Sequence, residues 1–429
     1  MAPLTLVRQA SGTVLGRVAR GGVAGLSGAL ASAGAQFLLV VVVTRALRVE
    51  QAGAFFTVTA LALMVAGVAK LDAGNGLIFF IARAKTYGYL GISGYIRAAL
   101  VPGVVVACVA GAVLYPQLGM LALILPVMVT ADVLLAATRG FGSMRPTVLY
   151  DGVLLPVTQL ALVAGVAVLG EPGWLPAAWA LPYVPVAILA ALSLRGRAPR
   201  TPYLPGTGHD LWRYTAPRSM AGAIQAVFQR LDIVVVAVLG GPAQAAVYTA
   251  ATRFKVVGQL ANQGLSQAAQ PRLVRALAEG DLPRARELYQ ATTMWLVVLT
   301  WPIWAGYAAA APWLLALFGS SYGSAAPVAL VLAGTMMLAT ACGMVDVVLT
   351  AAGHTTSSLV NLVVAIGVTV ALDIALIPSH GALGAVLGWS GGVIVKNLLP
   401  LWQIHRRYGL RPFGKHSLQA LKVRSWAAV

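Results

Sequence analysis

Two neighbouring apolar stretches in the second half of the chain carry polar side chains at helical spacing. In the first stretch, Arg218, Gly222, Gln225, Gln229 and Asp232 follow one another at intervals of four, three, four and three residues. On a helix this spacing places all five on one face. The second stretch repeats the pattern with Tyr248, Thr252, Lys255, Gln259, Asn262 and Ser266. Because polar groups are costly against lipid, both faces are expected to line an aqueous cavity.

The charges of these stretches indicate which ligands such a cavity would accept. Arg230, Arg253 and Lys255 are accompanied by a single acid, Asp232. Guanidinium and ammonium groups suit phosphate oxygens, and amide side chains supply hydrogen bonds suited to sugar hydroxyls. The sequence therefore favours a site for a phosphorylated, glycosylated lipid head.

A structural role for the same charges is also open. Arg230 and Asp232 could join helices, and Arg253 or Lys255 could reach a membrane interface. We favour ligand binding for Arg253 and Lys255 and a helix contact for Asp232, although its carboxylate could instead couple transport to a proton or sodium ion. Asp373, near the outer end of its apolar segment, is expected to face water.

The elements that must position these residues are membrane-spanning helices. Hydrophobic residues make up 59% of the 429 positions and charged residues 10%, which excludes an ordinary soluble domain. A helix needs about 20 apolar residues to cross a bilayer. Twelve segments qualify: 22–44, 52–71, 98–115, 118–138, 147–170, 173–194, 216–239, 243–266, 291–311, 325–350, 356–378 and 381–404. The predicted fold class is an all-α polytopic membrane protein with twelve transmembrane helices.

The basic residues predict the orientation of these helices. Most of the 30 lysines and arginines lie in every second gap, on the side of the N-terminus. Because basic loops stay in the cytoplasm, both termini are expected to be cytoplasmic, in a multi-pass protein of the cytoplasmic (inner) membrane. The net charge of +18 is explained by this topology and by contact with membrane lipids, so no nucleic acid partner is expected.

A basic segment rich in Pro and Gly, residues 195–215, divides the twelve segments six and six. The halves share short matches, such as Asp132-Val133 in the first and Asp346-Val347 in the second. The expected domains are an N-terminal six-helix lobe (1–194), a cytoplasmic linker (195–215), a C-terminal six-helix lobe (216–405) and a basic cytoplasmic tail (406–429). Parallel repeats of this kind commonly carry a substrate site near the midplane and work by alternating access.

The sequence contains no enzyme motif. It has no Walker-type phosphate loop, no metal-ligand spacing and no His-Glu-x-x-His. The predicted outer loops are too short and too poor in acids and histidines for a glycosyltransferase or polymerase. We therefore expect no enzymatic activity, no cofactor and no metal site.

Several short motifs resemble those of a transporter family. Thr44-Arg45-Ala46-Leu47 followed by Gly53-Ala54-Phe55, the turn at 70–74 and the later Leu317-Phe318-Gly319 are similar to segments of polysaccharide-unit (Wzx-type) flippases. These belong to the multidrug/oligosaccharidyl-lipid/polysaccharide (MOP) exporter superfamily. The resemblance covers roughly residues 15–405, and Arg48 replaces the glycine usual after Leu47, which indicates a divergent member.

The resemblance implies two MATE-like six-helix lobes around a cavity lined by the first, second, seventh and eighth spans. It implies that a polyprenyl-(pyro)phosphate-linked oligosaccharide is flipped to the outer leaflet for cell-surface polysaccharide biosynthesis, with polymerase or glycosyltransferase machinery as partners. Arg253 and Lys255 would then hold phosphate. The rest of the implied substrate-binding set is Arg230, Gln225, Gln229, Gln259, Asn262 and Gln36.

Two other functions stay open. A multidrug/cation antiporter of the same superfamily would need accessible acids for its cations, and the basic excess argues against it. A non-transporting lipid-binding scaffold relative would keep the fold and would tolerate neutralisation of Arg253 and Lys255.

Overall fold

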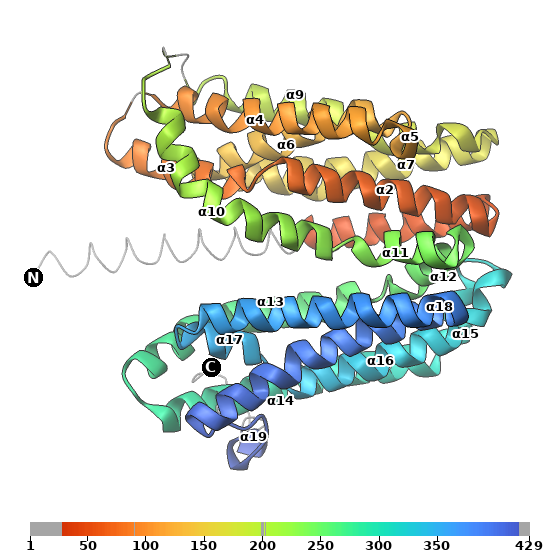
Figure 1. Cartoon of the computed structure of the whole chain (residues 1–429), viewed down its shortest axis with the longest axis vertical. Coiled ribbons are helices and arrows are strands. Elements are labelled where there is room, and N and C mark those ends of the chain that lie inside the picture. Colours follow the sequence, from red (N-terminus) through yellow and green to blue (C-terminus); the bar gives the residue numbers. More distant parts are fainter. Residues whose placement is uncertain (1–27, 90, 199–200, 202, 420–429) are drawn as a thin grey trace, which may run out of the picture. The chain divides into compact units, whose positions relative to one another are not determined.

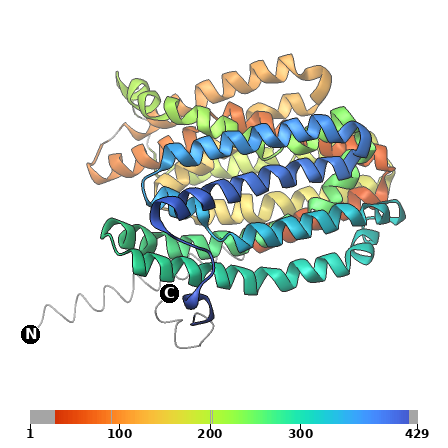
Figure 2. The ribbon, with the colours of Figure 1, turned by 60° about the horizontal axis from the view of Figure 1, so that its bottom comes forward.

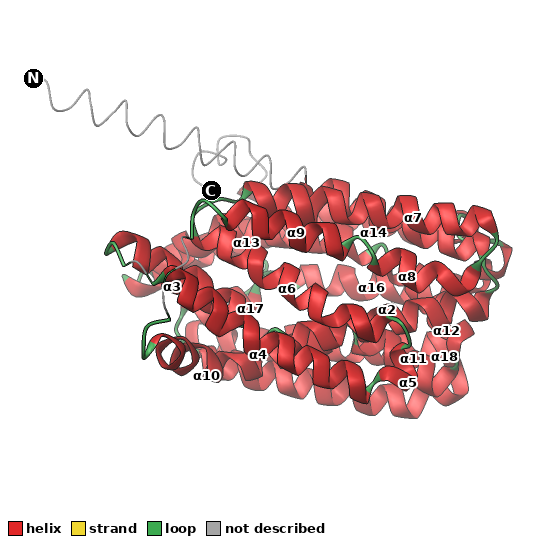
Figure 3. Ribbon diagram, turned by 90° about the horizontal axis from the view of Figure 1, so that it is seen from above, coloured by secondary structure: helices red, strands yellow, loops and turns green. Residues whose placement is uncertain are grey.

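The computed structural model describes residues 28–89, 91–198, 201 and 203–419. Within these residues every regular element is a helix and no strand occurs (Figure 3). Helices are expected of such apolar segments, because a helix satisfies its backbone hydrogen bonds internally and lipid offers none. The predicted all-α, membrane-spanning class is confirmed.

Contacts divide the described residues into two compact units, one of which holds those in 28–51 and 55–231 and the other those in 52–54 and 232–419 (Figure 1). The helices of the first unit are Gly28–Ala46, α2 (Val49–Ala69), α3 (Ala73–Thr86), α4 (Ile92–Val113), α5 (Tyr115–Leu118), α6 (Leu121–Gly140), η1 (Thr147–Leu154), α7 (Leu155–Leu169), η2 (Pro172–Trp174), α8 (Leu175–Ala180), α9 (Tyr183–Leu194) and α10 (Thr207–Phe228).

The main part of the second unit begins at Asp232, in α11. Its helices are α11 (Leu231–Gly240), α12 (Pro242–Thr252), α13 (Lys255–Ala278), α14 (Leu282–Ala309), α15 (Ala311–Ala316), η3 (Ser320–Ala325), α16 (Ala326–Ala341), α17 (Val345–Ala351), α18 (Thr355–Tyr408) and α19 (Lys415–Gln419). The division by contacts falls later than the proposed linker at 195–215, since α10 packs against α3 and α4.

Helix α6 is the core of the first unit, where it packs against α3, α4 and α9. Small residues allow the close approach. A methyl group at Gly111 of α4 would lie 2.8 Å from the carbonyl oxygen of Ala122, and one at Gly140 would lie 2.9 Å from Cβ of Ile81. Packing of small residues is the main source of helix association in lipid, where no hydrophobic force drives helices together.

Helix α3 lies outside the twelve predicted spans. Its 14 residues are too few to cross a bilayer, yet Leu77, Phe80 and Ile81 are buried on one side. The chain enters it through a tight turn in which Leu71 and Asp72 adopt positive φ angles of 50° and 51°. A count based on span length cannot detect such a helix.

Among the described residues, eight helices are long and apolar enough to cross a membrane, or nine if α10 and α11 form one broken span. The count of twelve and the position of the termini therefore stay predictions. Part of the difference arises in α18, whose 54 residues hold two of the predicted segments, 356–378 and 381–404. Another part arises at 243–266, where α12 ends and α13 begins within one predicted segment.

The two limbs of α18 lie side by side (Figure 2) and meet at Gly381, whose φ is 55°. Gln244 of α12 closes this turn, because its Oε1 accepts a hydrogen bond of 2.9 Å from the Ala382 amide. Farther along, Asn361 and Gln403 exchange two amide hydrogen bonds of 2.9 Å each. These contacts fix the two limbs as one antiparallel pair.

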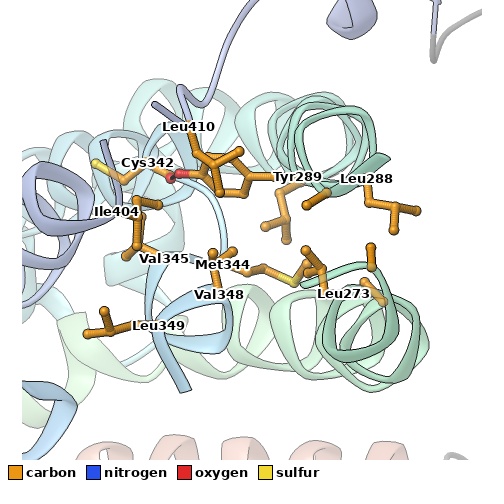
Figure 4. Packing of buried hydrophobic residues seen from close by; sticks show 14 residues of the cluster. Leu273, Leu288, Tyr289, Cys342, Met344, Val345, Val348, Leu349, Ile404 and Leu410 are labelled. Carbon is orange, nitrogen blue, oxygen red and sulfur yellow. Dashed lines mark hydrogen bonds between the residues drawn. The ribbon is translucent and has the colours of Figure 1, made fainter. Parts of the chain in front are cut away.

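A buried cluster joins α13, α14, α17 and α18 at one end of the second unit (Figure 4). Leu273, Tyr289, Val348 and Ile404 are each at most 1% exposed, and the Tyr289 hydroxyl donates to the carbonyl of Cys342. Asp281 separates α13 from α14 and caps the latter, since its Oδ1 accepts from the Arg284 amide at 2.9 Å. The helices on both sides of this break, α13 and α14, are long elements of the unit.

Candidate functional site

The carboxylate of Asp232, near the start of α11, is fully engaged within the second unit. Its Oδ1 accepts a 2.9 Å hydrogen bond from the Ile233 amide. Its Oδ2 accepts one of 2.9 Å from the Tyr248 hydroxyl and one of 3.3 Å from the Lys255 ammonium group. Asp232, Tyr248 and Lys255 come from three successive helices and meet at the Asp232 carboxylate.

The Lys255 ammonium group is held by aromatic rings as well as by Asp232. It lies 4.6 Å from the centre of the Trp389 ring, on the second limb of α18, and 5.5 Å from that of Tyr248. Lys255 is the first residue of α13, where the positive end of the helix dipole disfavours a cation. The carboxylate and the ring faces offset this cost. Lys255 therefore forms one ion pair and two cation–π contacts.

The break between α12 and α13 is stabilised by its surroundings. The Tyr307 hydroxyl donates a 2.7 Å hydrogen bond to the carbonyl of Ala251, in the last turn of α12. The ring of Phe254, inside the break, lies 4.5 Å from that of Tyr307. Arg253 is half-buried and follows the last residue of α12, where a cation complements the negative end of the helix dipole.

The predicted sugar-binding amides have different surroundings. Gln225, Gln229 and Asn262 have exposed side chains. Gln36 is half-buried in the first unit, where its Nε2 donates a 3.1 Å hydrogen bond to Gln159. The backbone of Gln259 belongs to α13, but its side chain lies outside what the structure describes.

The first unit holds a second group of charged residues that the sequence pattern did not single out as a site. The Lys70 ammonium group lies 3.6 Å from Asp132 Oδ2, and each side chain keeps more than two fifths of its surface exposed, at 43% and 42%. Asp72, just beyond Lys70, accepts hydrogen bonds from Asn75 at 2.7 Å and from Arg218 at 3.2 Å. These ion pairs connect the end of α2 with α6 and the turn before α3 with α10.

Two cavities, of about 310 and 220 Å³, border this group. Lys70, Asp132 and Asp151 line both cavities, and the smaller one also has Gln229 and Arg230 in its wall. Asp151 lies in η1, a π-helical stretch, and such stretches are frequent at functional sites. Arg230 is thus placed beside acids of the first unit, whereas Arg253 and Lys255 belong to the second.

One signal in the sequence could have found this group. Lys70, Asp132 and Asp151 stand near the same predicted side of three different apolar segments. Equal depth in the membrane is a condition for contact, but the helix order that makes them neighbours is a tertiary property.

Asp373, in the first limb of α18, differs from its predicted place. It is 3% exposed and does not face water. A methyl group at Gly388, on the other limb, would clash with Asp373 Oδ1. The missing side chain at Gly388 therefore leaves the space that admits the buried carboxyl group.

Residues 217–375 match the family model described as MatE. No curated protein matches the chain. Among solved structures, an inward-facing multidrug resistance MATE family transporter of the MOP superfamily is 16% identical, with a TM-score of 0.70 over 87% of this chain and 94% of that one.

Two further structures have the same fold. The lipid II flippase MurJ in an inward closed conformation is 10% identical, with a TM-score of 0.71 over 94% of this chain and 90% of that one. A MOP superfamily transporter from Pyrococcus furiosus, for which a reversed polarity of the binding pocket suggests a different function, is 16% identical, with a TM-score of 0.55 over 90% of this chain and 95% of that one. The fold of this chain is therefore that of MOP superfamily transporters.

Proposed function

We propose that this protein flips a polyprenyl-(pyro)phosphate-linked oligosaccharide from the inner to the outer leaflet by alternating access, as a step in cell-surface polysaccharide biosynthesis. The observation that carries the proposal is the sign of the charge in residues 216–266. The only acid in residues 216–266 is Asp232, and its oxygens already hold Lys255, Tyr248 and a backbone amide. The same stretch contributes Arg230 and Arg253.

An anionic head fits this arrangement better than a cationic drug. A cation would have to displace the Lys255 ammonium group from Asp232, and it would meet two arginines nearby in the sequence. Phosphate oxygens accept paired hydrogen bonds from guanidinium groups, and the exposed amides of Gln225, Gln229 and Asn262 can bond sugar hydroxyls. The multidrug/cation antiporter is thus the second candidate. The likeness to a lipid II flippase and to a transporter with reversed pocket polarity supports the first.

The roles of individual residues follow from their partners. Arg253 and Arg230 are our candidates for the phosphate groups, and Lys255 would reach phosphate only by leaving Asp232. The same exchange gives Asp232 a role in coupling: when Lys255 turns to the substrate, the carboxylate is free to take a proton or a sodium ion. Asp232 therefore stays our candidate for ion coupling.

The test is a leaflet assay of lipid-linked oligosaccharide in cells that lack this protein. We expect accumulation in the inner leaflet, with rescue by wild type and by Arg197→Gln, an exposed arginine outside the proposed site. Arg253→Gln and Arg230→Gln should each reduce the rescue at matched membrane levels. Gln is chosen because it removes the positive charge and introduces no acid.

Two outcomes would decide against parts of the proposal. Full rescue by both variants would remove these arginines from the site. An unchanged leaflet distribution without the protein, accompanied by increased sensitivity to cationic drugs, would favour the antiporter.

A further inference from the structure

A separate cavity of about 720 Å³ lies in the first unit where α3, α4 and α10 meet. It shares no lining residue with the two cavities around Lys70 and Asp132. Its wall is rich in aromatic rings, contributed by Phe80, Tyr87, Tyr89, Tyr95 and Tyr214. The sequence segments that form it, around 83–97 and 207–214, belong to gaps expected to face the cytoplasm.

The aromatic wall has a buried part and an exposed part. Phe80 and Tyr95, 7% and 8% exposed, stack with ring centres 4.9 Å apart. Tyr214 meets the edge of Phe80 at 5.8 Å and is held from behind by Phe79, which stacks on it at 4.7 Å. Tyr87, by contrast, is 78% exposed. Packed rings of this kind form a fixed apolar platform at little entropic cost on binding.

Charged groups stand at the edge of this platform. Arg83 lies 6.0 Å from the centre of the Tyr87 ring, and Arg213 enters the wall from α10. In the part of the chain that the structure describes, neither arginine forms an ion pair and none of the four tyrosine hydroxyls forms a hydrogen bond. Asp210, one turn before Arg213, is the single acid of the wall. The cavity thus offers two cations, several hydroxyl donors and one carboxylate acceptor.

We propose that this cavity binds a glycosyl phosphate. The phosphate would take hydrogen bonds from Arg83 and Arg213, the apolar face of the sugar ring would lie on the Phe80–Tyr95–Tyr214 platform, and Asp210 would accept a sugar hydroxyl. Inorganic phosphate alone would leave the rings unused, and an uncharged sugar would leave both guanidinium groups unused. The combination of groups therefore selects a molecule that has both parts.

The ligand could come from the membrane, as a lipid-linked sugar phosphate, or from the cytoplasm, as a soluble one. This inference does not rest on the transport proposal, because none of its residues belongs to the proposed substrate-binding set. In a flippase, a site that is expected to face the cytoplasm could bind the substrate before transport. Binding to it can nevertheless be measured without transport.

The test uses the full-length protein in phosphatidylcholine nanodiscs and equilibrium dialysis with radiolabelled glucose 1-phosphate. We expect saturable binding that glucose and inorganic phosphate compete with at least tenfold more weakly than unlabelled glucose 1-phosphate. Arg83→Gln/Arg213→Gln should weaken binding at least tenfold, and Tyr87→Ala severalfold. Arg197→Gln, an exposed arginine outside the cavity, should have no effect.

A second arm identifies the source. Nanodiscs that also contain polyprenyl-phosphate glucose should lose binding of the soluble label if the lipid occupies the site, and should keep it if the ligand is soluble. Tyr87→Ala is not expected to disturb folding, because this ring is mostly exposed, so weaker binding by this variant would reflect loss of the ring itself. Equal affinity for inorganic phosphate, unchanged binding in the double arginine variant, or no binding of either glycosyl phosphate would overturn the proposal.

Discussion

The Lys255 ammonium group lies 3.3 Å from Asp232 Oδ2, and the two side chains are 16% and 17% exposed. The lysine is the first residue of α13 and the acid is the second residue of α11, so the pair connects two helices of the second unit across α12. In a pair so little exposed, removal of one partner should cost more stability than removal of both. A single substitution leaves the other charge without a counter-ion.

Lys255→Met is expected to destabilise the protein by about 2 kcal/mol, below the cost for a fully buried pair because some water reaches both groups. Asp232→Asn should also destabilise, and Asp232→Asn/Lys255→Met should recover at least half of the loss. Thermal unfolding in detergent measures this. Losses that simply add in the double variant would show that the two charges do not interact.

The turn at Gly381 gives a prediction with a matched control in the same element. Gly381→Ala forces a side chain into positive φ and toward Gln244, whose Oε1 would be 2.5 Å from the new methyl group. A cost of about 2 kcal/mol is expected, visible as a lower unfolding midpoint. Gly367→Ala, in the first limb of α18 with open space around it, should be neutral or slightly stabilising. An equal effect of both changes would contradict the proposed role of the turn.

The ion pair of Lys70 and Asp132 is expected to contribute little to stability, unlike that of Lys255 and Asp232. Because both side chains are more than two fifths exposed, their ion pair should contribute less than about 1 kcal/mol. Lys70→Gln should therefore leave the unfolding midpoint nearly unchanged. If the neighbouring cavities take part in transport, the same variant should still reduce rescue in the leaflet assay. A large fall in stability would instead assign the pair to helix joining alone.

The predicted topology can be tested with single cysteines. In a background without Cys108 and Cys342, Arg197→Cys should react with a membrane-impermeant maleimide only after the cells are opened. Trp174→Cys, exposed in η2, should react in intact cells. The opposite pattern would reverse the orientation given by the basic loops, and labelling of both from one side would refute the single span predicted between them.

For the fold, hydropathy and charge were sufficient to predict the class, since any chain that crosses lipid must pair its backbone within helices. Helical spacing, a local property, placed Asp232 on one polar face and Tyr248 and Lys255 on another, but it did not predict that the three side chains meet. Helix α3 and the break at Arg253–Phe254 were not predictable in the same way. The first is too short for a span, and the second depends on Tyr307 and other residues far away in sequence.

The sequence by itself determined the identity of the charged residues and their positions along the apolar segments. Only the tertiary structure decided their partners. It placed Lys255 on Asp232 and Trp389, Arg230 beside Asp132 and Asp151, and Arg83 near Arg213 around one cavity. The physical reason is that helix packing in lipid follows small residues and close contacts between segments distant in the chain, and neither leaves a periodic signal in the residues that they bring together.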